Sequence, residues 1–171
     1  MTNGADAPDD VTDRAVAQWR AQRPDLDFSA MGPLARLARL AIFGGRLVDR
    51  VFETEGLDRG DFNVLAGLRR SGPPYRLTPS ELADALLTTR GAMTKRVDRL
   101  EALGLVKRTA NGADRRSLHV GLTDEGLRRI DALIVHHVEN ESRLLAVLAP
   151  REVAALDYAL RKLLHSIGDG A

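Results

Sequence analysis

Residues 78–122 constrain the fold of this chain more than any other stretch. The run Thr78-Pro79-Ser80-Glu81 places a hydroxyl at the N-cap, proline at the first helical position and glutamate at N3, which is the pattern of a capping box. We expect a short helix there and a second helix from about Thr89 to Leu103. Two extended segments, 105–108 and 118–122, follow it. Two consecutive helices and a hairpin predict a helix-turn-helix with a β-hairpin wing.

The second of these helices has one apolar face and one basic face. Met93, Val97 and Leu100 recur at i, i+4 and i+7, which predicts a buried stripe. The opposite face carries small and basic residues, namely Gly91, Lys95, Arg99 and Ala102. Such a face would let the helix approach a nucleic-acid duplex closely. The alternative is a charged solvent-exposed face, but faces of that kind are usually richer in glutamate.

Positive charge is concentrated in the same region. The 171-residue chain carries a formal charge of only +1, yet residues 88–116 contain eight basic and three acidic side chains. That segment is therefore at +5 and the remainder at −4. Phosphate contacts act over about one Debye length, roughly 10 Å, so a local cluster matters more than the total charge. A solvated basic surface is the alternative explanation for any such cluster.

Several classes of function lack support in the sequence. The chain contains no cysteine, its first residues are polar and acidic, and no stretch is long enough to span a bilayer, so we expect a soluble, cytoplasmic protein without a membrane partner. His136 and His137 point about 100° apart on a helix, which disfavours a metal site. Glycine-rich phosphate loops and nucleophile motifs are lacking, so we expect neither catalytic residues nor cofactors. A helical protein-interaction module is the stronger rival, but it leaves the basic hairpin unexplained.

Four ordered motifs carry a family resemblance, which extends from about residue 34 to 167. They occupy residues 77–82, 91–106, 114–116 and 122–126, and the third is Asp114-Arg115-Arg116. With these motifs the chain resembles the MarR family of winged-helix transcriptional regulators. The resemblance implies an obligate homodimer on a pseudo-palindromic double-stranded DNA, usually as a repressor. It also implies that the helix at 88–103 lies in the major groove and that Arg116 enters a minor groove.

We therefore expect DNA contacts from both the second helix and the wing. The wing would contribute Asp114, Arg115 and Arg116, with Asp114 orienting an arginine through a charge-assisted hydrogen bond. The helix and its N-terminus would contribute seven residues, which are Thr88, Thr89, Arg90, Gly91, Thr94, Lys95 and Arg99.

Long amphipathic helices flank this module, which does not need them for its own core. We interpret them as a homodimer interface, and an intramolecular bundle is the alternative. The expected fold class is mainly α with a small β-hairpin wing. The expected organisation is a disordered tail (1–12), N-terminal helices including an extra helix from Asp13 to Gln22 (13–56), a DNA-binding lobe (57–122) and C-terminal dimerisation helices (123–171).

The segment 19–27 resembles the extra N-terminal helix of the urate-responsive subgroup of the same family. In that subgroup a tryptophan, an aspartate and two arginines form an anion pocket. Trp19, Arg96 and Arg108 match by position, but Asn63 stands where the subgroup has aspartate. Asn63 removes the charge that urate would repel, so we expect a different small aromatic or organic anion as effector. The alternative role of Trp19 is a packing anchor that pins the N-terminal helix to the dimer.

Overall fold

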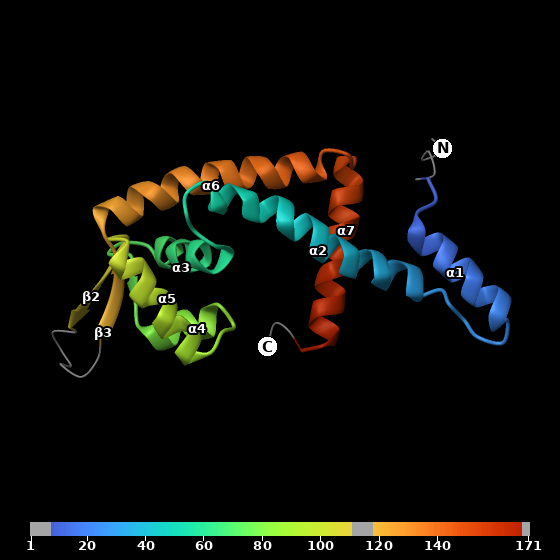
Figure 1. Ribbon diagram of the computed structural model, residues 1–171, viewed down its shortest axis with the longest axis horizontal. Helices are drawn as coiled ribbons and strands as arrows, with labels where there is room; N and C mark the ends of the chain where they lie inside the picture. The colour runs from blue at the N-terminus through green and yellow to red at the C-terminus, as the bar shows by residue number, and fades with distance from the viewer. Residues whose placement is uncertain (1–7, 111–117, 169–171) are drawn as a thin grey trace. The chain divides into compact units, whose positions relative to one another are not determined.

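The computed structural model describes residues 8–110 and 118–168 (Figure 1). It is mainly helical with one small antiparallel sheet, which confirms the expected fold class. Its elements are α1 (Val11–Gln22), α2 (Met31–Glu53), α3 (Arg59–Arg70), β1 (Arg76–Leu77), α4 (Pro79–Ala85), α5 (Arg90–Ala102), β2 (Val106–Ala110), β3 (Leu118–Leu122), α6 (Asp124–Leu145) and α7 (Pro150–Ser166). None of the helices within the described ranges combines the length and apolarity needed to cross a bilayer.

The chain forms two compact units, residues 1–47 and 48–171. The division falls before the expected boundary after residue 56, because the last turn of α2 packs with α3. The rings of Phe52 and Phe62 stack there with centroids 4.3 Å apart.

Helix α1, in the first unit, begins at Val11, two residues earlier than expected. Asp10 is the reason, because its carboxylate accepts a hydrogen bond from the Asp13 N–H (3.1 Å), while the Asp13 carboxylate accepts one from the Asp10 N–H (2.9 Å). This capping box satisfies donors that a helix start leaves open. Arg36 then pairs with both carboxylates. The last residues of the expected tail (1–12) therefore belong to a capped helix.

The core of the second unit is shared by α3, α4, α5, the sheet and α6. Met93, Val97 and Leu100 of α5 are each no more than 1% exposed, which confirms the predicted stripe. They lie in one cluster with side chains from the neighbouring elements, including Leu65, Leu82, Val120 and Ile130. The buried stripe fixes which face of α5 remains in solvent.

The sheet has the order β1-β3-β2, and both pairs are antiparallel. Val106 pairs with Leu122 and Arg108 with Val120, so one face of the hairpin points into the core. Strand β1 was not expected from the sequence, because two residues are too few to show alternation. In the register of the sheet, Gly121 faces a β1 residue on one side and a β2 residue on the other.

The sheet passes directly into α6 at a tightly packed junction. The Thr123 hydroxyl caps α6 by accepting from the Gly126 N–H (3.0 Å) and donates to the Gly104 carbonyl (2.7 Å). A Cβ at Gly126 would lie 1.9 Å from the carbonyl oxygen of Leu105, so only glycine fits there.

Candidate nucleic-acid interface

Two capped helices build the helix-turn-helix. The Thr78 hydroxyl accepts from the Glu81 N–H (3.2 Å), and the Glu81 carboxylate accepts from the Thr78 N–H (2.7 Å). This N–H and the Thr78 hydroxyl hold the pKa of Glu81 below its usual value. Thr89 caps α5 by accepting from the Ala92 N–H (3.2 Å). Both expected helix starts are present, and they set the direction of α5.

The expected helix residues lie together at the start and along the outer face of α5. Thr88, Thr89, Arg90, Gly91, Thr94, Lys95 and Arg99 are all exposed. Arg90 and Lys95 have no carboxylate partner within the part of the chain that the structure describes. A Cβ at Gly91 would meet nothing within 4 Å, so packing inside the protein does not require glycine there. On this face, Arg90 and Lys95 therefore lie near Gly91, which has no side chain, and neither cation has a carboxylate partner among the described residues.

Arg99 differs from the other cations, because its guanidinium is already bound. Its Nε donates to the Asp61 carboxylate (3.0 Å), and Nη2 donates to the Gly56 carbonyl (2.9 Å). Arg96 donates from Nη1 to the same carboxylate (2.9 Å). Asp61 is fully buried, so one carboxylate at the start of α3 holds two arginines of α5. This three-residue cluster is called the Asp61 hub below.

The Asp61 hub extends into the N-cap of α3. Asp61 and Asp58 form a reciprocal capping box, and Arg96 also pairs with Asp58. Burial acts to raise the pKa of Asp58, but the Asp61 N–H and the charge of Arg96 outweigh it, so this pKa lies below its usual value. A Cβ at Gly60 would overlap the Arg96 guanidinium at 2.2 Å, so the arginine lies flat on a bare backbone.

Sequence reasoning missed Asp61. The carboxylates at 58 and 61, three residues apart before an apolar run, were a visible capping signal. Nothing in that spacing reveals that Asp61 becomes buried beneath α5.

The three expected ligand residues of the second unit, Asn63, Arg96 and Arg108, make separate contacts. Arg108 pairs with Asp98 (2.5 Å) and with Glu101, whereas Arg96 belongs to the Asp61 hub. Within the described residues no hydrogen bond or ion pair links Asn63 to either arginine. Asn63 instead lines a cavity of about 250 Å³ between α3 and α6.

Trp19 lies in the first unit, half exposed, and its ring stacks on Phe28 with centroids 6.1 Å apart. This contact lies entirely within the first unit. The wing residues Asp114, Arg115 and Arg116 lie outside the described residues.

The sequence of this chain is similar to those of known transcriptional regulators. Residues 55–117 match the sequence model of the MarR family. The HTH-type transcriptional regulator PecS of Dickeya dadantii (strain 3937) is 40% identical over 148 residues, which cover 86% of this chain and 89% of PecS. Such relatives are transcriptional regulators, not enzymes.

Solved structures of transcriptional regulators are also similar to this chain. A cysteine-to-serine mutant of MarR from E. coli, crystallised with operator DNA, is 30% identical with a TM-score of 0.67, over 80% of this chain and 97% of that one. Sco3205 from Streptomyces coelicolor, crystallised with DNA, has a TM-score of 0.70 at 23% identity and covers 96% of this chain and 94% of that one. The second likeness is one of fold alone.

Proposed function

This chain belongs to the MarR family of winged-helix transcriptional regulators, and we propose that it represses transcription as a homodimer on a pseudo-palindromic DNA site. The observation that carries the proposal is the exposed face of α5, with its unpaired Arg90 and Lys95 around the bare Gly91. Cations without an internal carboxylate are free to neutralise phosphates, and each such contact releases counterions. Phosphate contacts of this kind fix the position of a helix in the major groove.

The proposed contacts divide by chemistry. Arg90 and Lys95 bind phosphates, while Gly91 lets the helix backbone come close to the bases. The hydroxyls of Thr88, Thr89 and Thr94 line the groove, and the wing residues Asp114, Arg115 and Arg116 reach the adjacent minor groove.

Arg99 plays a different part from the one expected. With Nε and Nη2 bound inside the protein, its first role is to hold α5 on α3. It contacts DNA only through its remaining donors.

Exposed apolar side chains support the homodimer. Helix α7 buries no residue; Leu163 and Leu164 in this helix and Ile167 at its C-cap are all exposed. Helix α2 likewise exposes Leu34 and Phe43. Patches of this kind mark protein–protein interfaces, and a second copy of the chain is the occupant that a two-fold DNA site requires. The two recognition helices would then lie roughly 34 Å apart.

A small aromatic or organic anion is proposed as the effector, bound by Trp19, Asn63, Arg96 and Arg108. An incoming anion would compete with Asp61 and Asp58 for the Arg96 guanidinium. Loosening the Asp61 hub would tilt α5 and lower its affinity for DNA. Allosteric couplings of this type are typically about 1–3 kcal/mol.

A mobility-shift titration tests the proposal. The full chain should shift the palindromic duplex from its own promoter region in a salt-dependent manner and shift a random duplex much more weakly. Absence of both shifts would favour the helical interaction module instead.

A further inference from the structure

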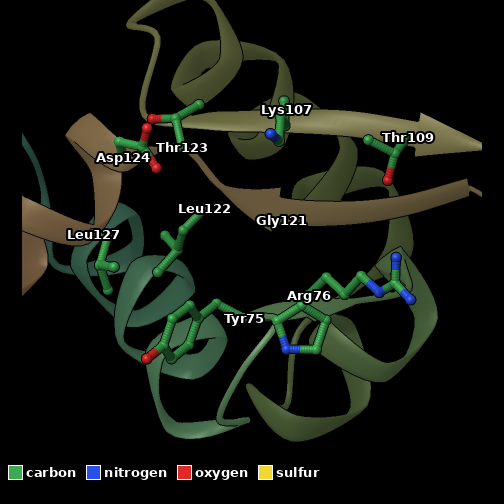
Figure 2. Close-up of a pocket in the computed structure, with 10 residues that line it drawn as sticks. Tyr75, Arg76, Lys107, Thr109, Gly121, Leu122, Thr123, Asp124 and Leu127 are labelled. Carbon is green, nitrogen blue, oxygen red and sulfur yellow. The ribbon is translucent and has the colours of Figure 1, made fainter.

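A cavity of about 400 Å³ lies on the outer face of the wing sheet, next to the start of α6 (Figure 2). Val106 and Val120, on the opposite face of the same strands, are buried in the core. The cavity thus lies mainly on the face of the hairpin that carries Lys107 and Gly121, and Leu122, whose side chain belongs to the core cluster, borders it next to α6. None of the residues proposed to contact DNA or the effector lines it. Its size is within the range of small-molecule sites.

Two cations line this cavity. Arg76 of β1 and Lys107 of β2 both pair in register with Gly121 of the central strand. Both are exposed, and neither has a carboxylate partner among residues 8–110 and 118–168. In contrast, Arg96, Arg99 and Arg108 nearby in the sequence are all paired. Two unpaired cations on one face leave positive charge that a bound anion would neutralise.

Gly121 leaves the space between these cations open. It has no side chain, and a Cβ there would lie 3.3 Å from the Cβ of Arg76, which is tighter than ordinary contact. Glycine therefore lets β1 approach the central strand and also keeps the floor between Arg76 and Lys107 bare. An anionic group can rest on that floor within reach of both side chains.

The rest of the lining combines apolar side chains with two threonines and one carboxylate. Leu122 and Leu127 lie toward the α6 side, and Asp124 is at the end away from Arg76 (Figure 2). Asp124 disfavours a second negative charge at that end and can accept a hydrogen bond from a ligand donor. The lining thus changes from cationic near Arg76 and Lys107 to apolar near α6.

Tyr75, also part of the lining, has a strained backbone. Its φ of 57° is unusual for a residue with a side chain. The conformation is held by the Tyr75 carbonyl, which accepts from the Leu122 N–H (3.1 Å), and by the Tyr75 N–H, which donates to the Gly72 carbonyl (2.6 Å). Strained residues of this kind cluster at ligand sites. Here the strain places the ring beside Leu122 and under the Arg69 guanidinium, 5.0 Å from the ring centre.

We propose that this cavity binds a small organic monoanion, with its anionic group between Arg76 and Lys107 and its apolar body over Leu122 and Leu127. The site is separate from the effector site that involves Trp19 and from the DNA-binding face of α5. It adds a ligand position at the junction of wing and α6.

Isothermal titration of the full chain with 3-phenylpropionate tests the proposal, and 3-phenylpropanamide serves as the uncharged analogue. Saturable binding of the acid is expected, with binding of the amide at least tenfold weaker. Arg76→Gln and Lys107→Gln should each weaken binding of the acid by roughly tenfold, because each removes a charge-assisted hydrogen bond. Lys162→Gln on α7 removes the same charge elsewhere and should leave the affinity unchanged.

Circular dichroism confirms that the variants fold, and amide shifts of Gly121 and Leu122 in NMR spectra should move on titration of the wild type. Absence of saturable binding, or wild-type affinity in both cavity variants, would overturn the proposal. So would a loss confined to Trp19→Ala, which would assign the probe to the effector site. DNA binding of the same samples is measured separately, so the two proposals fail independently.

Discussion

At the scale of single residues, Asp61 connects fold and function most directly. It is a fully buried carboxylate, yet it caps α3 and binds two arginines of α5. A buried charge is tolerated only when paired and hydrogen-bonded, and here every partner belongs to the helix-turn-helix lobe. The orientation of α5 and the burial of this carboxylate therefore depend on each other.

Replacing Asp61 with Asn should reduce both stability and DNA affinity. The amide keeps the size of the side chain but loses the charge that the guanidinium groups of Arg96 and Arg99 neutralise. We expect a loss of about 1–3 kcal/mol in the free energy of unfolding, measured by urea denaturation. Asp84→Asn, an exposed position on α4, is the matched control and should change little. Equal stability of the two variants would contradict the role of Asp61.

Asp58 should make stability depend on pH in the acid range. Its pKa in the folded protein is below the ordinary aspartate value of 3.8, so its contribution to stability is complete above that value and is lost as the pH falls through the folded pKa. The stability difference between wild type and Asp58→Asn should therefore be larger at pH 6 than at pH 3, in urea titrations at each pH. A difference that is the same at both pH values would count against the ion pair with Arg96.

At the scale of elements, two glycines in helices have opposite surroundings. Gly126 of α6 lies against the Leu105 backbone, and a Cβ there would come within 1.9 Å of a carbonyl oxygen. Gly91 of α5 faces open space. The first glycine is required by packing within the protein, whereas the second has no such requirement among the described residues. The proposed close approach of DNA to α5 would account for the second.

Alanine at these two positions should therefore have opposite effects. Gly126→Ala should destabilise the protein by about 1–3 kcal/mol, because the backbone must shift to admit the methyl group. Gly91→Ala should stabilise α5 by up to about 1 kcal/mol and weaken DNA binding. Thermal unfolding and a DNA titration on both variants measure this. A Gly91→Ala protein that binds DNA as well as the wild type would exclude close approach at this residue.

Local signals in the sequence were sufficient for the elements that they specify. The capping box at Thr78 and the stripe through Met93 predicted the helix-turn-helix, because each is encoded within a few residues. Strand β1 and the buried Asp61 could not be predicted in the same way. Both arise from contacts between segments distant in sequence, such as Asp61 with Arg99.

The same limit explains the interpretation of Arg99. Helical periodicity correctly placed it on the outer face of α5 but could not show that its guanidinium reaches the Asp61 carboxylate. Likewise, Arg96 pairs with Asp61, whereas Arg108 pairs with Asp98. Periodicity gives the face of a helix, whereas partners depend on the neighbouring elements.

At the scale of the whole molecule, the distribution of charge matters more than its total. The net charge of this chain is only +1, but the cations differ in their partners. Arg90 and Lys95 have no carboxylate partner among the described residues, whereas Arg96, Arg99 and Arg108 form internal ion pairs. Removal of an unpaired cation should lower DNA affinity because a phosphate contact is lost. Removal of Arg99 should lower DNA affinity because α5 is no longer held in position on α3. The salt dependence of affinity separates these effects, since each lost phosphate contact lowers its slope by about 0.9.

The most direct test is therefore the slope of log affinity against log salt concentration for the palindromic duplex, measured by fluorescence anisotropy. Lys95→Gln should lower the slope by about 0.9, Arg99→Gln should lower affinity with a smaller change in slope, and Lys162→Gln should match the wild type. A Lys95→Gln protein with wild-type affinity and slope would contradict the claim that the outer face of α5 binds DNA.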